Sequence, residues 1–101
     1  MADGVEPVAR TVTIGGPDGL RAALSITGAD SYVELDEDGE AAETSGSIAS
    51  DGDRITLQAD ETLRIRVGNA GAVRVSINGI TVGTMGGDGA VVEWRVERIG
   101  G

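Results

Sequence analysis

Carboxylates are the side chains that could do the most chemistry in this 101-residue chain. The acidic run at residues 36–40, Asp-Glu-Asp-Gly-Glu, could offer several oxygens to a hard cation such as Ca²⁺, together with Asp51 and Asp53. An EF-hand loop that started at Asp36 would need glycine and glutamate where the chain has Ala41 and Ser47. The run is therefore interpreted as a solvated hairpin tip without a metal, and a looser calcium site that includes Asp51 and Asp53 stays open as the alternative.

Paired carboxylates also catalyse glycoside hydrolysis, and the candidates here are Glu34, Asp36, Asp53 and Glu93. A catalytic carboxyl group needs burial to raise its pKa, which strand and turn positions in one small domain do not promise. The chain has no histidine, cysteine or lysine, which excludes histidine-based triads, cysteine nucleophiles, Schiff-base lysines and thiolate or imidazole metal sites. We therefore expect that the chain is not an enzyme and that it binds no cofactor.

The charge balance excludes a further class of partner. Eight basic residues, all arginine, stand against 17 acidic ones, so the net charge of −9 repels the phosphate backbone of nucleic acids. No apolar run approaches the roughly 18 residues of a membrane span, so we do not expect this segment to insert into a membrane. The glycine-rich segments 68–71 and 83–89 do not match the dinucleotide-binding fingerprint, and we interpret them as turns in which Gly68 and Asn69 supply positive φ values.

Two aromatic residues give opposite indications about exposure. Trp94 is in phase with the apolar positions on either side of it, which is typical of a core residue. Tyr32 is out of phase with Val33 and Leu35, so it is expected on the surface and is the best single candidate for a binding contact. Its neighbours Glu34, Asp36 and Asp38 complete the predicted binding residues.

Alternating apolar and polar residues indicate strands along most of the chain. We expect an all-β fold, an antiparallel, immunoglobulin-like β-sandwich of about seven or eight short strands. Residues 1–9 are interpreted as a flexible tail or linker and residues 10–99 as a single domain. The strands are expected at residues 11–14, 20–27, 31–36, 54–59, 63–67, 73–77, 80–82 and 91–99.

Two dipeptides predict tight hairpins between these strands. Asp38-Gly39 and Asn78-Gly79 are pairs that favour type I′ turns. The small, polar segment 41–50 is expected to form an irregular edge strand. On the last strand the polar face carries Glu93, Arg95 and Glu97, which could pair with Arg64, Arg66 or Arg74 on neighbouring strands.

The second half of the chain resembles the C-terminal domain of RodZ-like proteins. The resemblance lies in a strand that ends in Gly-Asn-Ala within residues 62–73, a strand that ends in Asn-Gly within residues 75–79, a glycine-bearing loop and a last strand. Residues 29–39 are similar to the Ser-Trp-Val hairpin of the family, with Tyr32 in place of the usual tryptophan. Residues 40–53 are more polar than the corresponding strand and turn of the family.

Several functional expectations follow from the resemblance alone. It implies an extracytoplasmic domain, periplasmic or on the cell surface, of a bacterial single-pass membrane protein that acts in cell-shape determination. The helix-turn-helix region and the membrane span of the family are not in this chain. The domain would bind a protein partner of the cell-wall elongation machinery without catalysis. A carbohydrate- or calcium-binding β-sandwich module of a secreted protein is the alternative.

Overall fold

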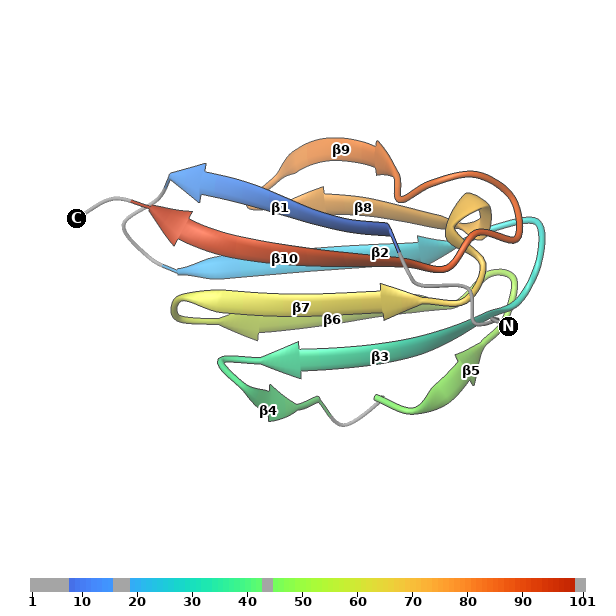
Figure 1. The fold of residues 1–101 in the computed structure, drawn as a ribbon, viewed down its shortest axis with the longest axis horizontal. Helices are drawn as coiled ribbons and strands as arrows, with labels where there is room; N and C mark the ends of the chain where they lie inside the picture. Colours follow the sequence, from blue (N-terminus) through green and yellow to red (C-terminus); the bar gives the residue numbers. More distant parts are fainter. Residues whose placement is uncertain (1–7, 16–18, 43–44, 100–101) are drawn as a thin grey trace.

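Ten β-strands and one short 3₁₀-helix make up the regular structure of the described part of the chain, residues 8–15, 19–42 and 45–99 of a computed structural model (Figure 1). The predicted all-β fold is confirmed. The strands exceed the predicted seven or eight in number because the described residues between Glu37 and Arg54 include two short strands, β4 and β5. Their bounds are β1 Val8–Gly15, β2 Leu20–Ile26, β3 Ser31–Glu37, β4 Glu40–Ala41, β5 Ser47–Ala49, β6 Arg54–Ala59, β7 Thr62–Val67, β8 Val73–Ile77, β9 Ile80–Thr84 and β10 Val92–Ile99; the 3₁₀-helix η1 is Ala70–Ala72.

The strands form two sheets that pack face to face. Sheet A has the order β1-β10-β7-β3-β4, with β5 also paired to β3, and sheet B has the order β6-β2-β8-β9. The neighbours β10, β7 and β3 correspond to the three-stranded sheet of an immunoglobulin sandwich, and the β2–β6 pair corresponds to two strands of its other sheet. Strands β8 and β9 extend sheet B, so the chain crosses from sheet A to sheet B and returns with β10.

The first strand departs from the expected pattern in two ways. It begins at Val8, inside the segment interpreted as a tail; residues 1–7 lie outside the described residues. It also pairs parallel with β10, from Val8 beside Val92 to Gly15 beside Ile99, so the sandwich is not purely antiparallel. No hairpin signal marks a parallel pair, because the connection is the whole of the intervening chain.

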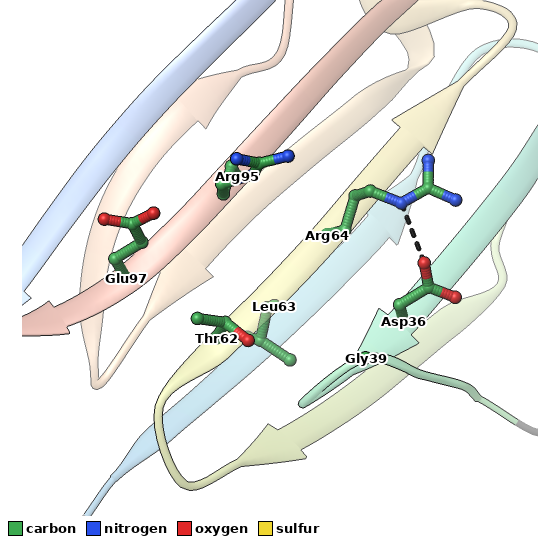
Figure 2. Close-up of a pocket in the computed structure, with 7 residues that line it drawn as sticks. All are labelled: Asp36, Gly39, Thr62, Leu63, Arg64, Arg95 and Glu97. Carbon is green, nitrogen blue, oxygen red and sulfur yellow. Dashed lines mark hydrogen bonds and ion pairs between the residues drawn. The ribbon is translucent and has the colours of Figure 1, made fainter.

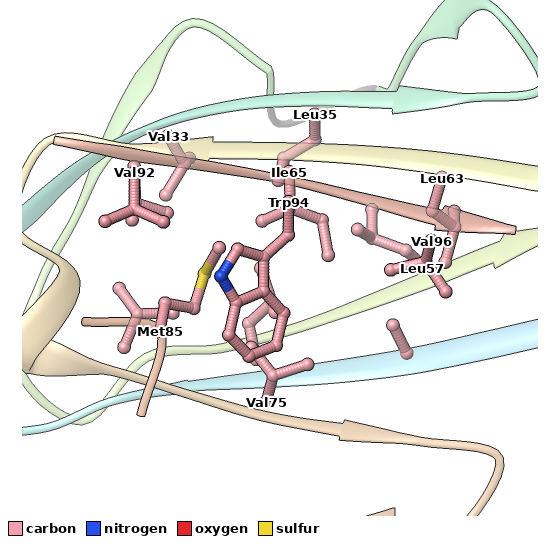
Figure 3. Close-up of a cluster of buried hydrophobic side chains, with 14 of the residues drawn as sticks. Val33, Leu35, Leu57, Leu63, Ile65, Val75, Met85, Val92, Trp94 and Val96 are labelled. Atoms are coloured by element: carbon pink, nitrogen blue, oxygen red, sulfur yellow. The ribbon is translucent and has the colours of Figure 1, made fainter. Parts of the chain in front are cut away.

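Aliphatic side chains that alternate along the strands fill the space between the sheets. Trp94 is 1% exposed and lies at the centre of this core, as its phase predicted, with Met85 beside it (Figure 3). Arg10 of β1 lies over the indole ring, with its guanidinium carbon 5.0 Å from the ring centroid. Met85 is also buried, so it packs the segment 83–89 against the core. The interpretation of this segment as a loop did not anticipate that contact.

The edge of sheet A at β3 is closed by segment 41–50. Beyond the short strands, Ala42 N–H donates to Leu35 O at 2.7 Å and Gly46 N–H donates to Val33 O at 2.8 Å. The Ser45 hydroxyl accepts from Leu35 N–H at 2.8 Å. These bonds satisfy backbone groups that would otherwise be open to another chain, so this irregular segment protects the edge from aggregation.

The Asn78-Gly79 turn is held by side-chain hydrogen bonds as well as by its backbone. The φ values are 51° at Asn78 and 81° at Gly79, those of a type I′ turn. The Asn78 side chain accepts from Arg21 N–H at 2.8 Å and donates to Gly19 O at 3.2 Å. This side chain therefore ties the β8–β9 hairpin to the start of β2.

We expect Asn78→Ala to lower the free energy of unfolding by about 1–3 kcal/mol, because it removes two hydrogen bonds and strains a positive φ. Chemical denaturation followed by circular dichroism measures the change. Asn78→Gly separates the two causes, because glycine relieves the strain and still lacks the hydrogen bonds. If Asn78→Ala matched the wild type in stability, the structural role of the Asn78 side chain would be wrong.

Candidate functional site

The outer face of sheet A gathers three of the four predicted binding residues and adds charges from β7 and β10. Alternation along β3 places Tyr32, Glu34 and Asp36 on this face, because Val33 and Leu35 are fully buried. The same alternation places polar side chains of β7 and β10 beside them. Those neighbours are Arg64 and Arg66 on β7, and Glu93, Arg95 and Glu97 on β10.

Tyr32 is exposed at one end of this face, as predicted from its phase. Its cross-strand neighbour on β5 is Ile48, and the two side chains are 44% and 68% exposed. The Tyr32 hydroxyl donates to Glu34 Oε2 at 3.1 Å, and this bond to a carboxylate is the main reason that the pKa of Tyr32 is raised. Arg66 lies 3.9 Å from the other Glu34 oxygen, so an apolar pair adjoins a charged pair.

Arg64 joins three strands at the middle of the same face. Its Nε donates to Asp36 Oδ2 at 2.7 Å and its Nη1 donates to Glu93 Oε1 at 2.9 Å (Figure 2 shows the first of these bonds). The hydrogen bond to the Asp36 carboxylate is the main reason that the pKa of Arg64 is raised. Partial burial of the guanidinium lowers this pKa, and the hydrogen bond to Glu93 raises it again. The predicted pairing of Glu93 is thus realised with Arg64, whereas Arg74 belongs to β8 in sheet B and cannot take part.

Asp38 stands apart from the other predicted binding residues, because its carboxylate closes a neighbouring turn. Oδ2 accepts from Asp60 N–H at 2.7 Å, and Oδ1 accepts from Glu61 N–H at 2.9 Å and from Thr62 N–H at 3.0 Å. These backbone bonds, led by the one from Asp60, hold the pKa of Asp38 below its ordinary value. Asp38 and Gly39 have φ values of 51° and 87°, so the turn has the type I′ form and its first residue also organises the β6–β7 connection.

A pH titration of stability tests this role of Asp38. Because its pKa is lower in the folded than in the unfolded protein, its contribution is present above the unfolded value near 3.9 and is lost as the pH falls through the folded value. We expect Asp38→Asn to lower the melting temperature at pH 6, and the gap from the wild type to narrow by pH 3. Glu40→Gln is the control, since Glu40 is an exposed residue of the same hairpin; an equal gap at both pH values for Asp38→Asn would contradict the assignment.

A shallow groove of about 370 Å³ crosses the outer face of sheet A at its other end (Figure 2). The floor of the groove lies at Thr62 and Gly39, because their side chains are shorter than those of the other residues that line it. Its walls come from three strands. The lining residues are Asp36, Gly39, Thr62, Leu63, Arg64, Arg95 and Glu97.

The calcium alternative loses its geometric basis in the structure. Asp51 accepts a hydrogen bond from Gly28 N–H at 2.9 Å, near the first residue of β3. The acidic run begins at Asp36, near the last residue of β3, so the two lie at opposite ends of this strand. Asp53 is likewise engaged, by Ser50 N–H at 2.8 Å. Within residues 8–15, 19–42 and 45–99, no group of three or more acidic side chains is placed to hold a metal ion.

The predicted turn at Gly68 and Asn69 is present, but not with the expected backbone. Asn69 has φ −144°, and Gly68 is not in the left-handed region either. The Asn69 side chain instead joins two loops, since it donates to Asp30 O at 3.2 Å and accepts from Gly89 N–H at 2.7 Å. Gly68 lies against Tyr32, where an added Cβ would meet the tyrosine Cβ at 3.4 Å.

Sequence reasoning missed the Tyr32–Ile48 pair and the Asp36–Arg64 bond. Both depend on strand order, namely β5 and β7 on either side of β3, which local patterns do not contain. The only sequence signal of the Asp36–Arg64 bond was the alternation of Arg64 and Arg66, which places both arginines on one face of β7. A separate finding is that no helix among the described residues is long and apolar enough to cross a membrane.

Comparison with known proteins supports one assignment. No curated protein and no solved structure matches the chain. The family model described as the RodZ C-terminal domain matches residues 23–94, from within β2 to the buried Trp94 of β10. That match covers more than half of the chain and includes Tyr32, Ile48 and the Asn78-Gly79 turn. The chain therefore belongs to the RodZ C-terminal domain family, a family of cell-shape domains that is not a known enzyme family.

Proposed function

We propose that this chain is a non-catalytic interaction domain of a RodZ-like, membrane-anchored cell-shape protein, and that it lies outside the membrane. Its partner is a protein of the cell-wall elongation machinery. Family membership supports the cell-shape role. The outer face of sheet A supports the interaction role, and the location rests on the resemblance to the family.

The exposed Tyr32–Ile48 pair is the observation that carries the proposal. The two residues are directly opposite each other on β3 and β5, and both expose a large apolar surface. Tyrosine is enriched at protein interfaces because it offers much rigid area with a polar tip. The ion pair of Glu34 and Arg66 adjoins it, so the end of the face has an apolar centre beside a polar border.

The form of this surface favours binding over catalysis. The face is an open sheet surface, and its groove is shallow where an active site is normally a walled cavity. Arg64 holds the carboxylate of Asp36, which lines the groove, and that of Glu93 on β10. A partner can therefore lie across three strands without entering the domain.

Photo-crosslinking in cells tests the interaction. A photoreactive amino acid replaces Tyr32 in the full-length membrane protein, and the crosslinked products are identified by mass spectrometry. We expect an elongation-machinery protein in the product, and Ile48→Asp should reduce its yield several-fold. The control position is Thr56, an exposed residue of β6 in sheet B. Equal crosslinking from positions 32 and 56, or a product without any such protein, would refute the proposal.

A labelling experiment tests the location separately. The chain has no cysteine, so Ile48→Cys places a single reactive group on an exposed position of this domain. We expect a membrane-impermeant maleimide to label that variant in spheroplasts before lysis. Labelling that appears only after lysis would place the domain in the cytoplasm.

A further inference from the structure

We infer that the groove on sheet A binds a single carboxylate side chain of an otherwise uncharged peptide segment, with Arg95 as the residue that receives it. This site is separate from the Tyr32–Ile48 pair, and the inference does not depend on the proposed partner. It rests on the shape of the groove, on the charges within it and on the orientation of Arg95.

The shape of the groove leaves room beside Arg95. Thr62 of β7 stands opposite Glu97 of β10, and Arg64 stands opposite Arg95. The short Thr62 thus lies between longer side chains, and Gly39 has no side chain at the end of the groove. The resulting volume of about 370 Å³ is at the lower end of what ligand sites enclose. Because the groove is open, the ligand must be a segment that lies on the sheet.

The charges within the groove leave Arg95 with unused donors. Arg64 already binds two carboxylates, Asp36 at 2.7 Å and Glu93 at 2.9 Å. Arg95 is directly opposite this arginine, an arrangement of like charges that is unfavourable by itself. Within the described residues, no ion pair joins Arg95 to a carboxylate.

The orientation of the two β10 side chains strengthens this point. In Figure 2 the guanidinium of Arg95 extends toward Arg64 on β7, while the carboxylate of Glu97 is directed the other way. Glu97 therefore does not pair with Arg95, and Glu93, on the other side of Arg95 along the same strand face, is bound by Arg64. Arg95 is one of the residues that line the groove.

A carboxylate is the ligand group that suits these donors. A guanidinium is planar and binds a carboxylate through two parallel hydrogen bonds, a geometry that no other side chain offers. The hydroxyl of Thr62, at the low part of the groove, can donate one further hydrogen bond to the same group. These contacts select an aspartate or glutamate side chain over an amide.

The test is an NMR titration of the ¹⁵N-labelled chain. The probe is an acetylated and amidated glutamine hexapeptide in which one glutamine is replaced by glutamate, and the matched all-glutamine hexapeptide has the same length without the charge. A glutamine hexapeptide with a free C-terminus separates a terminal carboxylate from a side-chain carboxylate. We expect saturable shifts of the backbone amides at residues 62–64 and 95–97 with the glutamate peptide only.

Three variants assign the binding to Arg95. Arg95→Gln should weaken it by about threefold or more, the scale of one exposed charge pair. Arg95→Lys should be intermediate, since it keeps the charge and loses the planar fork. Arg74→Gln, which removes an exposed arginine from sheet B, should bind as the wild type does. A thermal melt of each variant confirms folding.

Several outcomes would overturn the inference. These are equal shifts with the glutamate and amidated glutamine peptides, binding through the free C-terminus alone, equal losses in Arg95→Gln and Arg74→Gln, and the absence of saturable shifts at residues 62–64 and 95–97. The cell-crosslinking experiment reports on the Tyr32–Ile48 end of the face and is independent of all of them.

Discussion

Trp94→Ala is expected to lower the free energy of unfolding by about 3–5 kcal/mol, the typical cost of deleting a buried indole. The side chain is 1% exposed and lies at the centre of the core, beside Met85 and below Arg10. A domain of this size is stabilised by only about 5–15 kcal/mol in total, so the substitution removes a large share of its stability. Urea denaturation followed by circular dichroism is the measurement, because the variant lacks the only tryptophan.

The other aromatic residue supplies the matched control. Tyr32 is 44% exposed, and its hydroxyl bonds only at the surface, to Glu34. Tyr32→Ala should therefore change the free energy of unfolding by no more than about 0.5 kcal/mol. A loss for Tyr32→Ala as large as that for Trp94→Ala would mean that the inward and outward faces of sheet A are assigned incorrectly.

Gly71→Ala is the second substitution with a large expected effect, about 1–3 kcal/mol of destabilisation. A Cβ at this position in η1 would lie 2.7 Å from the Cα of Asp88 and 2.8 Å from its backbone nitrogen. The loop between β9 and β10 would have to move away, and this would disturb the bonds from Ala70 N–H to Ala90 O and from Gly89 N–H to the Asn69 side chain. Thermal and chemical denaturation measure the loss.

Gly87→Ala tests whether the effect of Gly71 comes from the close approach or from glycine as such. Gly87 lies in the same loop, has no atom within 4 Å of an added Cβ and does not have a positive φ. This variant should be within about 0.5 kcal/mol of the wild type. If Gly71→Ala is as stable as Gly87→Ala, then η1 and the loop are not packed as the structure describes.

Local patterns predicted most of the strands and two of the turns. Period-two alternation predicted the inward residues of β2, β3, β7, β8 and β10, because adjacent side chains of a strand point to opposite faces. It also separated the buried Trp94 from the exposed Tyr32. The Asp38-Gly39 and Asn78-Gly79 pairs predicted the turns at those residues, since such pairs adopt positive φ at low cost.

Contacts between distant segments could not be read in the same way. The parallel pairing of β1 with β10 joins residues about as far apart as the chain allows, and no turn signal announces it. The engagement of Asp38 with the β6–β7 turn also depends on two connections that meet in space. The backbone of Asn69 was predicted wrongly because its side chain bonds to Asp30 and Gly89, which override its local preference for a positive φ.

The amino-acid sequence by itself determined that this protein is an all-β domain with an aliphatic core, an exposed Tyr32 and no histidine, cysteine or lysine. Its motifs also indicated the family. The tertiary structure alone decided which outward side chains meet, since strand order set Ile48 beside Tyr32 and Arg64 between Asp36 and Glu93. The physical reason is that alternation fixes the face on which a side chain lies, while the pairing of whole strands fixes its neighbours on that face.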